Sequence, residues 1–180
     1  RCIPNMVICT PSDENETRKL LTTAYLHNGP ASVRYPRGAG PNSNVDKDLK
    51  PLKIGEANII NEESSEIVIL NFGTLLNEAN QISKELKATL VDMRFVKPLD
   101  EKLLRKLFKK AKVFISIEDG SIMGGAGSAV QEFASKENLN VRSILFGIPD
   151  KFIEHASREE MLVEAGLDVE NIKSKLSKLL

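Results

Sequence analysis

The sequence contains no tryptophan, only two cysteines and two histidines, and no excess of charge of either sign. Its 25 basic and 25 acidic side chains give a net charge of zero. The chain therefore lacks the excess of basic residues that is typical of nucleic-acid-binding proteins, and its net charge gives no attraction to an anionic membrane surface. No apolar run approaches the roughly 20 residues that span a bilayer. We therefore expect no nucleic-acid partner and no membrane segment.

The two cysteines, Cys2 and Cys9, are too few for a disulfide framework and favour reduced thiols in the cytoplasm. Cys9 lies within an apolar run and is expected in the core. No cysteine and histidine cluster has the spacing of a zinc site, so we expect no structural metal. The chain also lacks a signal-peptide pattern and an initiator methionine, and we expect it to begin within a longer protein.

The 180 residues, 41% hydrophobic and 28% charged, are typical of a globular protein with one domain and a piece of another. The apolar run at residues 6–10 predicts a buried strand. Asp13 and Glu16 then resemble a capping box at a helix start, and Gly29-Pro30 ends the helix as a C′ glycine followed by proline would. Residues 31–35 predict a second strand, which leaves the sheet of this first region incomplete.

Residues 38–53 lack apolar periodicity, and glycine, proline, asparagine and serine fill 7 of these 16 positions, which predicts a linker. A regular alternation follows. It predicts strands at residues 55–60, 67–72, 88–92, 113–118 and 141–146, and helices at residues 74–86, 99–111, 125–136, 158–164 and 169–180. This order is typical of an α/β fold with a mostly parallel sheet.

Arg34 and Arg37 belong to the segment Val-Arg-Tyr-Pro-Arg-Gly, residues 33–38, at the carboxyl end of a predicted strand. Ligands of α/β proteins bind outside such strand ends, and guanidinium groups bind phosphate bidentately. No acidic residue lies between Glu16 and Asp46, so we expect an uncompensated pair of charges, which could bind a phosphate. The alternative is a pair of surface arginines in ion pairs, which an extended segment would point to opposite faces.

The glycine-rich turn Met-Gly-Gly-Ala-Gly-Ser, residues 123–128, precedes a predicted helix and could cradle a phosphate on free amides. It matches neither the dinucleotide-binding nor the Walker pattern. We therefore favour close packing of the helix start against the sheet or a partner. Glu118 and Asp119 could hold a cation or act as acid and base, but we prefer a cap for the following turn.

Asp92 and Arg94 follow another predicted strand, and we expect a structural ion pair there. His27 closes a predicted helix, where a positive charge suits the helix dipole, and His155 lies in a predicted loop. The order of residues suggests no Ser-His-Asp or Cys-His arrangement. We therefore interpret both histidines as structural.

Seven segments, in order along the chain, resemble the carboxyl-terminal part of the 1-deoxy-D-xylulose-5-phosphate synthases, a branch of the transketolase family. They are Thr-Pro-Ser-Asp-Glu-Asn-Glu (10–16), Val-Arg-Tyr-Pro-Arg-Gly (33–38), Leu-Asn-Phe-Gly-Thr (70–74), Val-Asp-Met-Arg-Phe-Val-Lys-Pro-Leu-Asp (91–100), Met-Gly-Gly-Ala-Gly-Ser (123–128), Phe-Gly-Ile-Pro-Asp (146–150) and Glu-Glu-Met (159–161). Because these segments are spread in family order over nearly the whole chain, and several are long, the resemblance is specific to this branch.

The resemblance implies a three-layer transketolase C-terminal-like domain with a mostly parallel sheet at residues 54–180. Residues 1–37 would be the last strands and helix of the thiamine-pyrimidine-binding domain, and residues 38–53 the linker. It implies a cytoplasmic homodimeric transferase that joins pyruvate to glyceraldehyde 3-phosphate with loss of carbon dioxide. The cofactor would be thiamine diphosphate, held through magnesium, and the product would feed isoprenoid, thiamine and pyridoxal synthesis.

The family's phosphate-binding arginine falls on Arg37, and Arg34 is a weaker candidate. The family's Gly-Asp-Gly metal motif, its activating acid and its proton-transfer histidines have no counterpart here. The nearest string, Glu118-Asp119-Gly120, stands in another context. We therefore expect no catalytic, cofactor-binding or metal-binding residue in this chain, no cofactor bound to it alone, and no synthase activity without the rest of the synthase chain.

Two other functions remain open at this point. The chain could be a non-catalytic interaction or dimerisation module, with the glycine-rich turn as a packing site. It could also be a subunit like those of split transketolases or the β chains of 2-oxo acid dehydrogenases. Such a subunit would carry a complete pyrimidine-binding domain, and this chain carries only its last strands.

Overall fold

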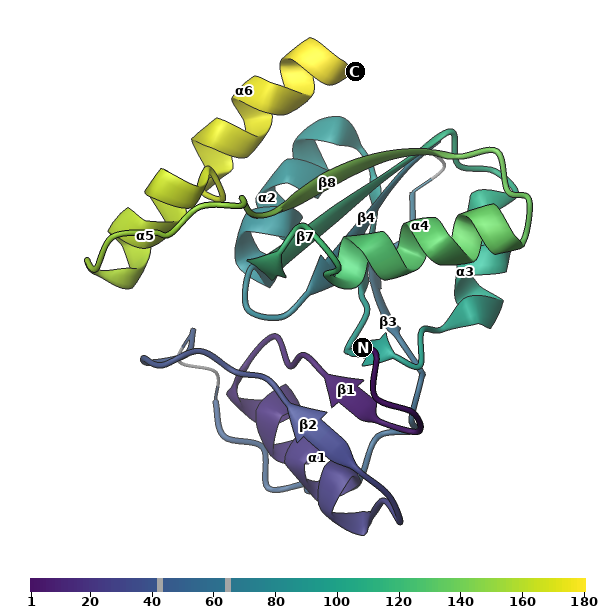
Figure 1. The fold of residues 1–180 in the computed structure, drawn as a ribbon, viewed down its shortest axis with the longest axis vertical. Helices are drawn as coiled ribbons and strands as arrows, with labels where there is room; N and C mark the ends of the chain where they lie inside the picture. Colours follow the sequence, from purple (N-terminus) through teal and green to yellow (C-terminus); the bar gives the residue numbers. More distant parts are fainter. Residues whose placement is uncertain (42–43, 64–65) are drawn as a thin grey trace.

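The computed structural model describes residues 1–41, 44–63 and 66–180, which form two lobes (Figure 1). We call the small lobe the three-stranded sheet β2-β1-β6 with helix α1 (Glu14–Leu26), seen at the bottom of Figure 1. The large lobe is the five-stranded sheet β3-β5-β4-β7-β8 with the other helices. The two lobes meet where the carboxyl ends of β1 and β2 approach the large sheet.

The large sheet confirms the predicted alternation of strands and helices. Its strands are β3 (Asn58–Asn61), β4 (Ile67–Phe72), β5 (Thr89–Asp92), β7 (Val113–Ser121) and β8 (Arg142–Ile148). Strands β5, β4, β7 and β8 pair in parallel, and only the edge strand β3 runs antiparallel, against β5. The sheet is therefore mostly parallel, as predicted.

Helices cover both faces of this sheet, which gives the predicted three layers. Alternate residues of β4 separate the two cores, because neighbouring side chains of a strand point to opposite faces. Leu70 packs in the cluster with helices α3 (Glu101–Phe108) and α4 (Ala126–Lys136). Ile69 packs in the other cluster, with helices α2 (Leu76–Leu86), α5 (Arg158–Ala165) and α6 (Val169–Leu179).

Capping side chains begin several helices where the sequence predicts them. The Asp168 side chain accepts a hydrogen bond from the Asn171 amide at the start of α6, and Asp13 accepts one from the Glu16 amide at the start of α1. The Glu16 carboxylate, which we assigned to a capping box, instead forms a bidentate ion pair with Arg94. The expected C′ glycine is wrong, since α1 ends at Leu26 and extended backbone at His27 follows it.

The small lobe contains a strand that we did not predict. β6 (Phe95–Lys97) comes from the sequence of the large lobe and pairs antiparallel with β1 (Val7–Cys9), which pairs in parallel with β2 (Ala31–Val33). The buried core of this lobe is Val7, Cys9, Leu20 and Phe95. Cys9 is buried as expected, and burial raises the pKa of its thiol to about 11.

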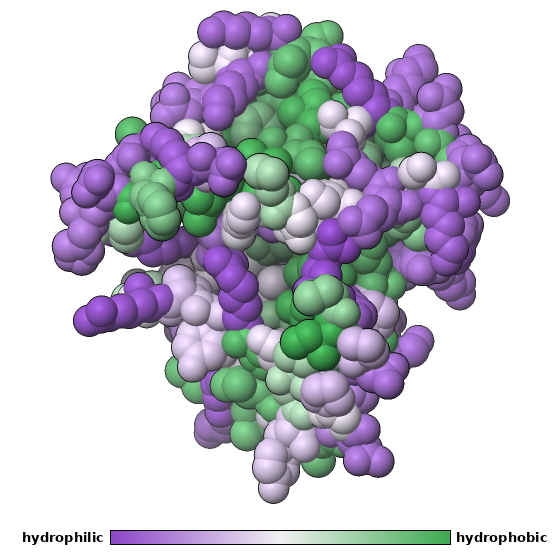
Figure 2. Space-filling model, in the orientation of Figure 1, coloured by the Kyte–Doolittle hydropathy of each residue, from purple (hydrophilic) through white to green (hydrophobic). Residues whose placement is uncertain are grey.

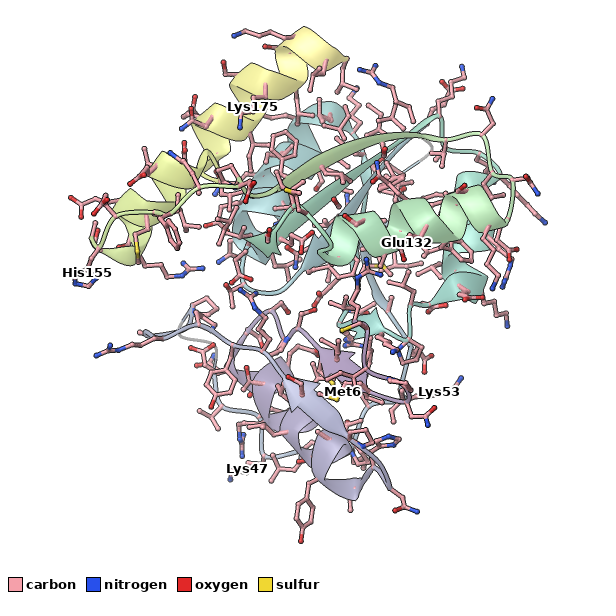
Figure 3. The ribbon with its side chains drawn as sticks, viewed as in Figure 1. Met6, Lys47, Lys53, Glu132, His155 and Lys175 are labelled. Carbon is pink, nitrogen blue, oxygen red and sulfur yellow. The ribbon has the colours of Figure 1, made fainter. Side chains whose placement is uncertain are left out.

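The segment between β2 and β3 has no helix or strand in residues 34–41 and 44–57. It nevertheless packs on α1. The Leu52 amide donates to Thr23 Oγ1 at 2.7 Å, and Lys19 Nζ lies 2.9 Å from Asp46 Oδ2. Figure 3 shows Lys47 and Lys53 on either side of the small lobe, so the segment runs across it.

Apolar residues remain on the surface of both lobes among the hydrophilic ones (Figure 2). On α1, Tyr25 is 88% exposed and Leu26 is 63% exposed, so this helix buries only one face. Phe152, in the loop before α5, is 99% exposed. Within the described ranges, no helix combines the length and apolarity that a membrane crossing requires.

Candidate functional site

Arg34 continues the β1–β2 pairing one residue beyond the strand, since its amide donates to the Cys9 carbonyl at 2.9 Å. Its guanidinium then reaches across to the large lobe. Nη1 forms an ion pair with Asp119 Oδ1, and Nη2 donates to the Asp119 carbonyl oxygen at 2.8 Å. Our expectation of an uncompensated pair is therefore wrong for Arg34, because its partner lies 85 positions away in the sequence.

Asp119 belongs to a chain of polar contacts at the carboxyl ends of β2, β4 and β7. Thr74 Oγ1 donates to Asp119 Oδ2 at 3.1 Å, and Arg158 Nη2 donates to Thr74 Oγ1 at 2.8 Å. The Asp119 side chain is only 17% exposed, so these contacts hold a carboxylate that is mostly shielded from water. No local pattern around Asp119 points to Arg34, so the sequence indicates only a cation ligand, an acid or a cap at this position.

Arg37 is exposed and lines a hollow of about 310 Å³ between the small lobe and α5. Arg158, the first residue of α5, lines the same hollow, together with apolar side chains that include Ile153 and Met161. Among residues 1–41, 44–63 and 66–180, no carboxylate forms an ion pair with Arg37 or Arg158. The hollow therefore offers two unneutralised guanidinium groups to an anion, and an apolar wall beside them.

Arg158 was not among the predicted site residues. The available signal was its place at a helix start, where a positive charge opposes the helix dipole. Such an unfavourable placement is a reason to look for a compensating contact. In the structure the contact is the neutral Thr74 hydroxyl, which leaves the charge of Arg158 without an acidic partner in the described ranges.

The glycine-rich turn is a packing site, as we favoured. Glu118 Oε2 accepts from the Ala126 amide and Oε1 from the Gly127 amide, each at 2.9 Å, so a carboxylate occupies the amides that could have held a phosphate. A Cβ on Gly127 would stand 2.3 Å from Ser116 Oγ, which explains the need for glycine. Burial raises the pKa of Glu118, against the opposing effect of these two amide donors. The expected cap is thus made by Glu118, on α4.

Asp92 and Arg94 do not pair with each other, so that expectation is wrong. Each contacts the start of α1 instead. Ser12 Oγ donates to Asp92 Oδ2 at 2.7 Å, and Arg94 forms its bidentate ion pair with Glu16 at 2.7 and 2.8 Å. Arg94 has a φ of 58°, a left-handed conformation that turns the chain between β5 and β6. These two contacts join the lobes.

Cation binding finds no support in the described residues, which contain no group of three histidine, cysteine, aspartate or glutamate side chains placed to hold a metal ion. His27 is the cap residue of α1, and His155 lies in the loop before α5 (Figure 3). The guanidinium groups of Arg37 and Arg158, which line the hollow, can instead recognise an anionic group at the boundary between the lobes.

Two family models match the chain. The transketolase C-terminal domain matches residues 55–172, and the transketolase pyrimidine-binding domain matches residues 1–42. Among curated proteins, 1-deoxy-D-xylulose-5-phosphate synthase of Pseudomonas fluorescens (strain Pf0-1) is 50% identical over 174 residues, 97% of this chain and 27% of that protein. The synthase of Stutzerimonas stutzeri (strain A1501) is 52% identical over 181 residues, 100% of this chain and 28% of that protein. The chain therefore spans about a quarter of the length of these relatives.

Solved structures show the same fold. A split gene transketolase, described as an inactive beta4 tetramer, matches with a TM-score of 0.84 and 25% identity over 99% of this chain and 58% of that one. The transketolase from Campylobacter jejuni matches with a TM-score of 0.68 and 18% identity, over 99% of this chain and 27% of that one. The second likeness concerns the fold alone.

Proposed function

Because this chain belongs to the transketolase family, we propose that it is the carboxyl-terminal segment of a 1-deoxy-D-xylulose-5-phosphate synthase. Residues 1–37 would form the end of the pyrimidine-binding domain, and residues 54–180 would be the C-terminal domain. Residues 38–53 would be the linker between them. About 50% identity to curated synthases over nearly the whole chain supports this assignment. The parent would be a cytoplasmic homodimer that condenses pyruvate with glyceraldehyde 3-phosphate and releases carbon dioxide.

The task of this chain in that reaction is to bind the phosphate of glyceraldehyde 3-phosphate through Arg37. The observation that carries the proposal is that Arg37 lines the boundary hollow without a carboxylate partner among the described residues. A phosphate dianion forms short, charge-assisted hydrogen bonds to a guanidinium, which presents its donors as a planar fork. Arg34 is the weaker candidate, since Asp119 neutralises it.

Thiamine diphosphate and magnesium do not fit the residues of this chain. The described ranges hold no cluster of acids for the metal, and Glu118 occupies two amides of the glycine-rich turn. We propose that the rest of the parent chain binds the cofactor, which supplies the carbanion chemistry when bound, and that these 180 residues alone are inactive.

The test is Arg37→Ala in the full-length synthase. We expect a loss of about 2–3 kcal/mol in transition-state binding, or about 30- to 150-fold in kcat/KM for glyceraldehyde 3-phosphate. Glyceraldehyde without the phosphate should lose less than about twofold, because the missing contact is to the phosphate. Arg105→Ala is the control, since Arg105 pairs with Glu101 and Glu137 on the surface. Equal losses for both aldehydes would contradict the role of Arg37.

A split-enzyme subunit is the second candidate, supported by the likeness to the split gene transketolase. In that case, or for a dimerisation module, the isolated chain would associate through exposed apolar residues such as Phe152. Sedimentation velocity of the 180-residue chain separates the candidates. A stable oligomer at micromolar concentration favours a free-standing subunit or module, and a monomer favours a segment that needs its parent.

A further inference from the structure

We propose that Asp119 is a positioning residue: through its ion pair with Arg34, it fixes the segment of residues 34–38 so that Arg37 faces the substrate phosphate. This inference rests on the proposed function and deepens it. Asp119, in the large lobe, would thus help to position a phosphate-binding arginine that belongs to the small lobe.

Asp119 holds the Arg34 guanidinium with two different atoms. The Oδ1 atom pairs with Nη1, and the main-chain carbonyl oxygen accepts from Nη2 at 2.8 Å. Two donors on one planar group fix its orientation as well as its position. The Arg34 amide is also bonded to the Cys9 carbonyl, so both the backbone and the side-chain end of this residue are held.

The Asp119 carboxylate is itself immobilised from the other side. Thr74 Oγ1 donates to Oδ2 at 3.1 Å, while Arg158 donates to the same hydroxyl at 2.8 Å. Gly73 has a φ of +98°, and a Cβ built there would stand 3.4 Å from Asp119 Oδ1, so the β4–α2 turn closes on the carboxylate. These contacts give Arg34 a rigid anchor on the large sheet.

Fixing Arg34 also restricts the position of Arg37, because the two residues between them have little conformational freedom. Pro36 has a fixed φ, and the residue before a proline, Tyr35, is confined to extended conformations. Arg37 therefore follows Arg34 through a short connection with little freedom. Residues 34–41 have no helix or strand of their own, so without Asp119 no regular structure would hold the segment. A small displacement of a binding group is costly, since about 1 Å can reduce a rate about 100-fold.

The experiment uses the full-length synthase with Asp119→Asn, an isosteric change that removes the charge. We expect kcat/KM for glyceraldehyde 3-phosphate to fall about tenfold, mainly through KM. The value for glyceraldehyde, which has no phosphate, should change less than about twofold, and Asp119→Glu should recover part of the loss. Glu137→Gln is the matched control, because it breaks the Arg105 ion pair of the same lobe far from the hollow. If the role of Asp119 were purely structural, Asp119→Asn would lower kcat/KM equally for both aldehydes, and that result would overturn the inference.

A double-mutant cycle with Arg37→Ala separates this inference from the proposed function. If Asp119 acts through Arg37, adding Asp119→Asn to Arg37→Ala causes no further loss for glyceraldehyde 3-phosphate. An additional loss of about tenfold overturns the positioning role while leaving the role of Arg37 intact. If Arg37→Ala causes no phosphate-specific loss, the proposed function itself fails. Should Asp119→Asn not fold, Arg34→Ala removes the same link from an exposed side chain and must give the same phosphate-specific loss.

Discussion

The two lobes differ in how they are held together. The large lobe has two extensive buried clusters, one on each face of its sheet, whereas the small lobe has a core of four buried side chains. One of those four, Phe95, arrives on β6 from the sequence of the large lobe. The small lobe therefore depends on the large lobe for its core, and the segment that carries Arg37 depends on the large lobe as well.

Removing the Phe95 side chain should have the largest effect on the difference between the lobes. Phe95→Ala in the 180-residue chain is expected to cost about 3–5 kcal/mol, because a fully buried ring leaves a cavity in a very small core. Amide hydrogen exchange should show lost protection in β1 and α1 and retained protection in β4 and β7. Phe114→Ala, in the large lobe, should instead lower protection in both lobes. Equal loss in β1 and β4 after Phe95→Ala would contradict the dependence we describe.

Asp92 should make the contact between the lobes sensitive to pH. Burial raises the pKa of its carboxyl to about 6 from 3.8, so the folded chain keeps a proton that the unfolded chain has released. The stability should therefore fall as the pH rises from about 4 to about 6, by up to about 3 kcal/mol, and stay lower above that range. Asp92→Asn should remove this slope. Urea unfolding at several pH values measures it, and parallel curves for the two proteins would refute the assignment.

The Glu16–Arg94 ion pair should contribute less, about 2 kcal/mol of coupling, because both side chains are mostly buried and the pairing is bidentate. A double-mutant cycle with Glu16→Gln and Arg94→Met measures this coupling. The exposed Glu101–Arg105 pair is the matched control and should give less than about 0.5 kcal/mol. Similar coupling free energies in the two pairs would mean that the ion pair between the lobes is no stronger than an exposed surface pair.

Removing the Tyr25 side chain should give the smallest effect on the stability of the 180-residue chain. Tyr25 is 88% exposed on α1, so Tyr25→Ala should change the stability of the 180-residue chain by less than about 0.5 kcal/mol. In the full-length parent, where we propose that more of the pyrimidine-binding domain covers α1, the cost should exceed about 1 kcal/mol. Thermal unfolding of both lengths provides the test. The same small effect in both would leave α1 uncovered in the parent.

Local pattern predicted much of the large lobe. The strand at residues 67–72 has the predicted bounds because it is buried on both faces, and the sequence shows this as a short, nearly continuous apolar run that ends at Gly73. The Asp168 cap was equally visible, since it acts on an amide three residues away. Such features depend on residues that are close together in the sequence, so a local sequence pattern can predict them.

Contacts between the lobes were invisible for the opposite reason. Arg34 and Asp119 are 85 positions apart, and Glu16 and Arg94 are 78 apart. Charge alone does not say which distant acid an arginine meets. The strand β6 was missed because three residues between a left-handed turn and a proline have no periodicity to detect. The candidate site lies at this boundary, so Arg34 and Arg37 could be named from the sequence, whereas Arg158 and the pairing of Arg34 with Asp119 could not.

The pairing of β6 with β1 also determines how the chain is threaded. The backbone passes between the lobes at the segment before β3, again from β5 to β6, and once more from β6 to α3. A single protease cut at the exposed Lys47 therefore severs one covalent connection and leaves the β1–β6 ladder intact. The two pieces would elute together and separate only in denaturant, as a complementing pair of fragments.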